Sequence, residues 1–155
     1  MNSYTQVLAD DQATEALGRQ LSVLLAGKGV VYLTGELGAG KTTLARGIIR
    51  GMGHGGAVKS PTFTLVEPYQ FAEQAVYHFD LYRLEDPEEL EYLGIDDYLE
   101  GGDLCLIEWP EKGAGHLPPW DLSIELVVLA EGRKVLINAN SAFGEQICGG
   151  LVDSR

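Results

Sequence analysis

The glycine-rich segment from Gly35 to Thr42 reads Gly-Glu-Leu-Gly-Ala-Gly-Lys-Thr and matches the phosphate-binding pattern G-x-x-x-x-G-K-[ST]. Glycines let the backbone approach an anion closely, so that successive N–H groups can point at a phosphate. Lys41 can reach the β- and γ-phosphates as a positive charge, and the Thr42 hydroxyl can bind Mg²⁺. A random chain of this length would match the pattern about one time in 200. The segment therefore predicts a site for a nucleoside triphosphate.

The expected nucleotide contacts lie in one continuous stretch of chain. Thr43 follows the motif and is placed to contact the α-phosphate. A helix that begins near Lys41 would add the partial positive charge of its N-terminus. The predicted contacts are Gly35, Gly38, Ala39, Gly40, Lys41, Thr42 and Thr43.

Magnesium needs a second protein ligand, which is normally an acid at the end of a neighbouring apolar strand. Glu108 follows the apolar run Leu104–Ile107, and Asp80 follows the run Val76–Phe79. One acid can hold the metal or its water shell while the other orients the attacking water or accepts its proton. An acid at a strand end can also be a solvated cap, and taken alone each acid allows that interpretation.

These side chains need a strand before the loop and a helix after it. Val30–Thr34 is a β-branched, apolar run that predicts a buried parallel strand. After Lys41, apolar residues recur at helical spacing on one face, and glycines end the helix; the apolar positions are Leu44, Ile48, Ile49 and Met52. The loop thus has the strand–loop–helix context that its motif requires.

The rest of the chain supplies the other elements of an α/β fold. We expect a strand at 4–8, a helix capped by Asp10 or Asp11, an antiparallel pair at 62–69 and 75–82, a helix opened by Asp86-Pro87 and broken at Gly94, a strand at 104–107, a hairpin at 123–130 and 134–138, and a final short helix. No repeat or linker divides the chain. The sequence therefore predicts a single domain over residues 1–155, an α/β P-loop nucleotide-binding fold with a central mixed, largely parallel sheet flanked by helices.

Composition excludes several classes of protein. The 155 residues carry a formal net charge of −12, which argues against a generic basic nucleic-acid binder. No apolar run approaches the roughly 20 residues that span a bilayer, and no secretory signal is visible, so we expect a cytoplasmic protein without membrane contact. Cys105 and Cys148 match neither a disulfide framework nor a zinc site and are expected to be structural thiols.

Four ordered segments of the chain resemble the TsaE (YjeE) family of small bacterial P-loop ATPases. The segments 35–43, 60–66, 78–84 and 107–111 read GELGAGKTT, SPTFTLV, HFDLYRL and IEWPE. The resemblance runs from about Gln12 to the last predicted strands. It implies Mg-ATP hydrolysis by a protein that is a monomer alone and acts with the TsaD and TsaB proteins. Those partners install the threonylcarbamoyl group on tRNA adenosine beside the anticodon, so the resemblance links this chain to tRNA only through that complex.

The resemblance also implies roles for individual residues. Lys41 becomes the phosphate lysine, and Thr42 and Glu108 become the magnesium ligands. Asp80 resembles a residue needed for hydrolysis. The segment 60–64, with Thr62 at its centre, resembles a switch near the γ-phosphate, although its Ser-Pro-Thr sequence also fits an ordinary rigid turn.

Five further side chains are candidates for the site, and four of them also fit a second interpretation. In this family Thr14 lies by the base, but helix capping explains it equally well, and Glu111 is a candidate for the wall of the nucleotide pocket. His78 fits a half-buried strand histidine better than a base or ligand, because no cysteine or second histidine stands at metal spacing. Trp109 fits core packing or contact with the nucleotide. Arg83 fits an internal arginine finger or an ion pair with nearby acids.

Three functions compete for this site: an ATPase that times a larger assembly, a small-molecule kinase, and a nucleotide switch without turnover. A kinase needs cationic side chains over the transferred phosphoryl group. Residues 84–132 contain no arginine and a single lysine, Lys112, which argues against the kinase. The Asn/Thr-Lys-x-Asp pattern that reads guanine is absent, which favours ATP.

The negative charge is confined to one part of the chain. Residues 1–83 hold seven acidic and seven basic side chains, whereas residues 84–132 hold 14 acidic side chains and one basic. One interpretation is that the acidic side chains of residues 84–132 form a face exposed to solvent. The alternative hypothesis is that residues 88–100 present an acidic surface to a basic partner protein.

Overall fold

The strand-forming runs assemble into one seven-stranded sheet with the order β1-β7-β6-β2-β5-β4-β3. The computed structural model describes residues 2–61 and 64–154. The strands are β1 (Ser3–Leu8), β2 (Val30–Gly35), β3 (Val66–Gln70), β4 (Ala75–Asp80), β5 (Leu104–Glu108), β6 (Leu122–Val128) and β7 (Arg133–Ala139). The helices are α1 (Asp11–Leu25), α2 (Lys41–Gly51), α3 (Glu89–Leu93), α4 (Ile95–Glu100), the 3₁₀ helix η1 (Pro110–Gly113) and α5 (Ala142–Asp153).

The centre of the sheet is parallel and its margins are antiparallel. Strand β2 pairs in parallel with β5 and β6, and β4 pairs in parallel with β5. Antiparallel pairs add β7 and β1 on one side and β3 on the other. The predicted α/β fold with a mixed sheet is confirmed, but the parallel pairs do not outnumber the antiparallel ones. The expectation of a largely parallel sheet holds for its four central strands.

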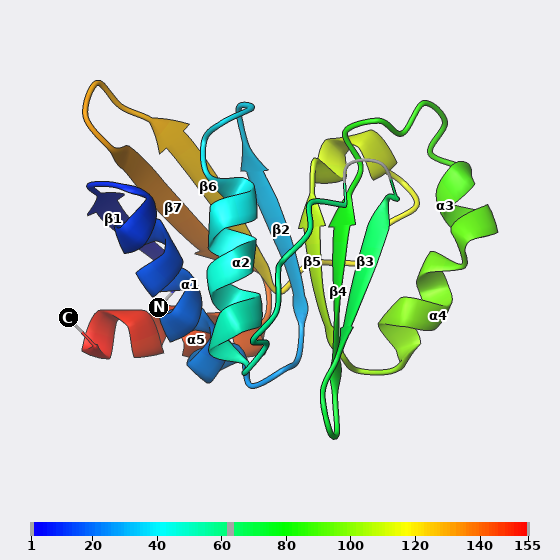
Figure 1. Cartoon of the computed structure of the whole chain (residues 1–155), viewed down its shortest axis with the longest axis horizontal. Coiled ribbons are helices and arrows are strands. Elements are labelled where there is room, and N and C mark those ends of the chain that lie inside the picture. Colours follow the sequence, from blue (N-terminus) through cyan, green and yellow to red (C-terminus); the bar gives the residue numbers. More distant parts are fainter. Residues whose placement is uncertain (1, 62–63, 155) are drawn as a thin grey trace.

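Hydrophobic cores lie on both faces of the sheet because successive strand residues point to opposite sides. In β5, Leu104 and Leu106 belong to the core that includes α1, α2 and α5, whereas Cys105 and Ile107 belong to the core under α3 and α4. Figure 1 shows α1 and α2 in front of one half of the sheet and α3 and α4 beside its other end. Among the described residues, no helix has the length and apolar character that a membrane crossing requires.

The two cysteines are buried free thiols. Burial raises the pKa of Cys105 to about 12. Both are in the packed cores, Cys148 on α5 and Cys105 on β5. A buried thiol of this kind is unreactive, which agrees with the structural role expected from the sequence.

Several local predictions are confirmed. Asp10 caps α1, because its carboxylate accepts a hydrogen bond from the Ala13 N–H at 2.8 Å. Gly94 separates α3 from α4 with a φ of 77°, in the left-handed region that favours glycine. The last two strands form an antiparallel hairpin, and Leu129 N–H donates to the Gly132 carbonyl at its turn.

Other boundaries differ from the predictions. Strand β3 begins at Val66 rather than at residue 62, because Leu65 has a φ of 66° and turns the chain; residues 62 and 63 lie outside the described residues. Strand β4 ends at Asp80, before the predicted end at residue 82. The helix expected at Asp86 begins at Glu89, since the Asp86 carboxylate accepts from the Glu88 N–H in a preceding turn.

Two glycines let α1 and α2 pack backbone against backbone. A Cβ added at Gly47 would lie 2.3 Å from the Glu15 carbonyl oxygen, and one added at Gly18 would lie 2.6 Å from the Leu44 carbonyl oxygen. At both positions the atoms that the added Cβ would meet belong to the backbone, so no flexible side chain can move aside. This contact holds α2, the helix that follows the glycine-rich loop, against α1.

We expect Gly47→Ala to destabilise the protein by about 2 kcal/mol, because overpacking outweighs the gain of about 1 kcal/mol in helix propensity. The melting temperature should fall by about 4–8 °C in a thermal unfolding experiment. Gly149→Ala in α5 is the matched control, since an added Cβ meets nothing within 4 Å there. It should leave the melting temperature unchanged or raise it; an equal loss in both variants would contradict the close helix contact.

Candidate functional site

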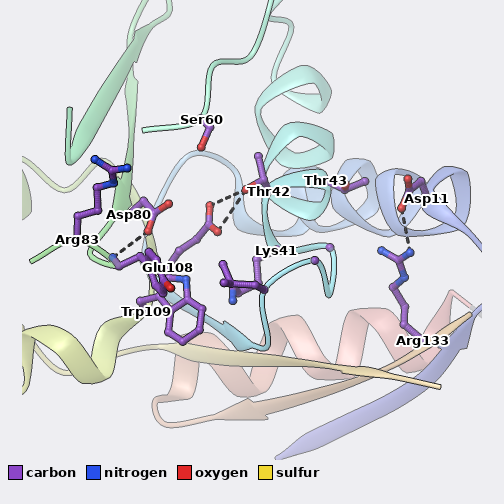
Figure 2. A pocket seen from close by; sticks show the side chains of 14 residues that line it. Asp11, Lys41, Thr42, Thr43, Ser60, Asp80, Arg83, Glu108, Trp109 and Arg133 are labelled. Atoms are coloured by element: carbon purple, nitrogen blue, oxygen red, sulfur yellow. Dashed lines mark hydrogen bonds and ion pairs between the residues drawn. The ribbon is translucent and has the colours of Figure 1, made fainter. Parts of the chain in front are cut away.

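A cavity of about 380 Å³ lies where β2, β4 and β5 end. The register pairs Leu33 with Glu108 and Glu108 with Asp80, so these carboxyl ends form one edge of the sheet. Figure 2 shows the side chains that surround the cavity. Its lining residues are Asp11, Leu37, Gly38, Gly40, Lys41, Thr42, Thr43, Ser60, Asp80, Tyr82, Arg83, Glu108, Trp109 and Arg133. The structure therefore brings the phosphate motif together with both predicted acids.

The glycine-rich loop has a backbone that other residues rarely adopt. Gly35, Gly38 and Gly40 have φ values of 136°, 80° and 109°. Gly40 is the N-cap of α2, and no side chain among the described residues caps this helix end. The first N–H groups of a helix have no intrahelical partner, so they can donate to an anion.

Lys41 lies buried at the base of the loop. Its Nζ donates to the carbonyl oxygen of Gly35 and to that of Glu36, the latter at 3.3 Å. The same Nζ lies 3.8 Å from the centre of the Trp109 ring, within the range of a cation–π contact. Burial lowers the pKa of Lys41 from its ordinary value, and the negative charges of Glu108, Asp80 and Glu111 act in the opposite direction. The loop thus holds a partly desolvated lysine where phosphate oxygens would bind.

Thr42 and Glu108 face each other across the end of the sheet (Figure 2). The Thr42 hydroxyl lies 3.4 Å from Glu108 Oε1 and 3.3 Å from Oε2. Oxygen donors of this kind fit Mg²⁺, which usually takes one or two protein ligands together with phosphate oxygens and water. No cluster of three or more His, Cys, Asp or Glu side chains able to hold a metal occurs in the part of the chain that the structure describes.

His78 lies behind Glu108 in the interior. The sequence predicted a half-buried strand histidine, but the side chain is fully buried. Its Nε2 lies 2.5 Å from Glu108 Oε2. The prediction was wrong about exposure because the inward face of β4 is covered by the core that includes α2.

Asp80 and Arg83 lie at the end of the cavity beyond Glu108. Asp80 is buried, and one of its carboxylate oxygens accepts a hydrogen bond from the Tyr82 N–H at 3.0 Å. Trp109 contacts Tyr82, with ring centroids 5.0 Å apart. Ser60, the first residue of the predicted switch segment, also lines the cavity, whereas Thr62 lies outside the described residues.

Other predicted residues lie farther from the cavity. Thr14 is buried in α1, and its hydroxyl donates to the Asp10 carbonyl at 3.1 Å, a bond within the first turn of the helix, whose cap is Asp10. Glu111 lies exposed on η1, close enough to raise the pKa of Lys41 but outside the cavity lining. Gly35 and Ala39 belong to the loop backbone behind the lining residues. Roles for these residues in nucleotide contact stay predictions.

Sequence reasoning missed Arg133 and Asp11. Arg133 Nη1 donates to the Ala39 carbonyl at 3.2 Å, and Nη2 lies 3.0 Å from Asp11 Oδ1. Figure 2 shows this pair at the opposite end of the cavity from Asp80. The charge of Arg133 is the sequence signal that could have indicated it as a site residue, because it is the first arginine after Arg83. Arg133 had no predicted role, because it falls just before the strand expected at 134–138.

Comparison with known proteins gives consistent matches over nearly the whole chain. The sequence model of the family "Threonylcarbamoyl adenosine biosynthesis protein TsaE" matches residues 8–135. The chain is 47% identical over 152 residues to the tRNA threonylcarbamoyladenosine biosynthesis protein TsaE of Haemophilus influenzae, covering 95% of this chain and 96% of that protein. It is 39% identical over 138 residues to the protein of the same name from Bacillus subtilis, covering 88% and 86%.

A solved structure has the same architecture. The crystal structure of Bacillus subtilis YdiB aligns with a TM-score of 0.79 at 28% sequence identity. The alignment covers 98% of this chain and 95% of that one. The match supports the α/β fold described above.

We expect two glycine-to-alanine substitutions in the glycine-rich loop to lower the free energy of unfolding by different amounts. A Cβ at Gly35 would lie 2.5 Å from the Leu126 carbonyl oxygen, whereas one at Gly38 meets nothing within 4 Å. Gly35→Ala should cost about 3 kcal/mol from strain and overpacking, and Gly38→Ala about 1 kcal/mol from its positive φ alone. Thermal unfolding without nucleotide measures both. Equal melting temperatures for the two variants would contradict the packing of the loop against β6.

Proposed function

The chain belongs to the TsaE family of threonylcarbamoyl adenosine biosynthesis proteins, and from this premise we propose that it is a Mg²⁺-dependent ATPase. In this proposal ATP hydrolysis serves the formation of N6-threonylcarbamoyladenosine in tRNA, in the cytoplasm. The observation that carries the proposal is the meeting of a phosphate loop with the Thr42–Glu108 pair at one edge of the sheet. The chain supplies nucleotide chemistry and does not itself transfer the threonylcarbamoyl group.

Each group of residues around the cavity has a role in the proposed mechanism. The loop N–H groups and Lys41 would hold the phosphates, and Thr42 and Glu108 would hold Mg²⁺. When bound, Mg²⁺ neutralises charge on the phosphate oxygens. Asp80 lines the cavity next to Glu108, where a carboxylate can orient the attacking water and accept its proton.

The ATPase is favoured over a kinase and over a passive switch by the charges around the cavity. Arg83 and Arg133 line the cavity, but the segment 84–132 between them contains one lysine and no arginine, so it offers no cationic lid of the kind that a kinase needs. Lys112, that lysine, lies over the Tyr82 ring at 5.9 Å from its centre. Two buried acids at the cavity, Asp80 and Glu108, favour hydrolysis over a site that only binds.

The proposal also includes two partner proteins. We expect the chain alone to be a monomer with slow turnover and to be stimulated by the TsaD and TsaB proteins, meeting tRNA only through that complex. Steady-state phosphate release from Mg-ATP, with and without both partners, tests this. Stimulated release supports the proposal. Absence of turnover even in the full assembly would refute the ATPase.

Two substitutions should separate binding from hydrolysis. Lys41→Ala should weaken ATP binding by about 100-fold or more, because it removes the only lysine on the loop. Asp80→Ala should spare binding and lower turnover by about 10²–10⁴-fold, the usual contribution of a general base. Asp96→Ala, an exposed acid on α4, is the control for removal of a carboxylate. Unchanged turnover in Asp80→Ala would assign Asp80 to structure.

The acidic surface on α3 and α4 gives a separate prediction about assembly. Glu89, Asp96 and Glu100 are exposed, and reversing all three to lysine should weaken binding to a basic partner and flatten its salt dependence. Binding to TsaB and TsaD at low and high salt measures both effects. The control is Glu145→Lys on α5, which is exposed on a distant helix. An unchanged affinity and salt dependence would leave the segment as a solvated face.

A further inference from the structure

His78 and Glu108 form a close, buried side-chain contact beside the cavity. The two side chains are 0% and 3% exposed, and Nε2 lies 2.5 Å from Oε2. His78 stands two residues before Asp80 on β4, and Glu108 stands opposite Asp80 on β5. His78, Asp80 and Glu108 therefore share one face at the end of two paired strands.

The histidine is not explained by packing alone. Its Nδ1 is buried and has no hydrogen-bond partner among the described residues. A buried polar atom without a partner costs free energy, and an apolar ring of similar size would fill the space without that cost. Nε2 is thus the ring atom whose contact can account for an imidazole at this position.

Glu108 needs such a contact to be held in place. Its two oxygens lie 3.3 and 3.4 Å from the Thr42 hydroxyl, near the long end of hydrogen-bonding distance. The contact with His78 is much shorter. A glutamate has three rotatable side-chain bonds, so a short, buried hydrogen bond from Nε2–H limits its freedom far more than the Thr42 contact does.

We propose that His78 is a positioning residue, which donates to Glu108 Oε2 and holds the carboxylate facing Thr42 so that Oε1 is presented to a magnesium ion. The inference rests on the proposed function, because it assumes that Glu108 is a metal ligand. His78 does not itself touch the metal or the nucleotide, and it is not among the residues that line the cavity. Partners that orient a metal ligand in this way commonly contribute 10–100-fold to metal affinity.

Affinity for a non-hydrolysable ATP analogue, measured by calorimetry with Mg²⁺ and with EDTA, tests the proposal. His78→Phe removes the donor and keeps the ring, and the enhancement of affinity by Mg²⁺ should fall about 10-fold while the affinity in EDTA stays unchanged. His78→Gln is the matched control, since its amide Nε2 can replace the imidazole donor. It should retain the enhancement within about 3-fold.

Melting temperatures show whether each variant is folded. If His78→Phe does not fold, His78→Asn decides, because its amide is too short to reach Oε2 and should lose the enhancement in the same way. A folded donor-free variant with the wild-type Mg²⁺ enhancement, or with equal losses in Mg²⁺ and in EDTA, would overturn the role of His78. Wild-type protein that binds the analogue equally well with and without Mg²⁺ would instead contradict the proposed function.

Discussion

The parallel register of β4, β5 and β2 is the constraint on which the site depends. It pairs Asp80 with Glu108 and Glu108 with Leu33, two residues before the loop begins at Gly35. Three segments that are far apart in the chain therefore end at one edge of the sheet. A one-residue slip of β5 would turn Glu108 to the opposite face, under α3 and α4, and leave Thr42 without its acid.

The same constraint explains why the charged residues of the site can be buried. Lys41, Glu108 and Asp80 are all buried, and each has close polar neighbours; Asp80 accepts a hydrogen bond from the Tyr82 N–H. Lys41 donates to loop carbonyls and lies over Trp109, while Glu108 has His78 behind it and Thr42 in front. The close α1–α2 packing through Gly18 and Gly47 fixes the helix from which Lys41 and Thr42 project. The result is a site whose polar groups are positioned by the fold.

The sequence was sufficient for those parts of the fold that depend on local patterns. The phosphate loop, the capped helix α1 and the central apolar strands follow from glycine spacing, Asp10 and hydrophobic runs. What it could not predict depends on contacts between distant segments. The start of β3 follows from the left-handed conformation of Leu65, the burial of His78 from the helix packed on β4, and the position of Arg133 from its contact with Ala39 across the loop. Periodicity carries no information about such contacts.

The central claim is that the cavity at the ends of β2, β4 and β5 is a Mg-ATP site. A crystal structure of the protein with Mg²⁺ and a non-hydrolysable ATP analogue tests it most directly. The account predicts phosphates along the loop from Gly35 to Thr42, Lys41 Nζ bound to phosphate oxygens, and a metal about 2.0–2.1 Å from the Thr42 hydroxyl, with Glu108 as a direct or water-mediated ligand. Nucleotide bound elsewhere, or phosphates in the loop with no metal between Thr42 and Glu108, would contradict it.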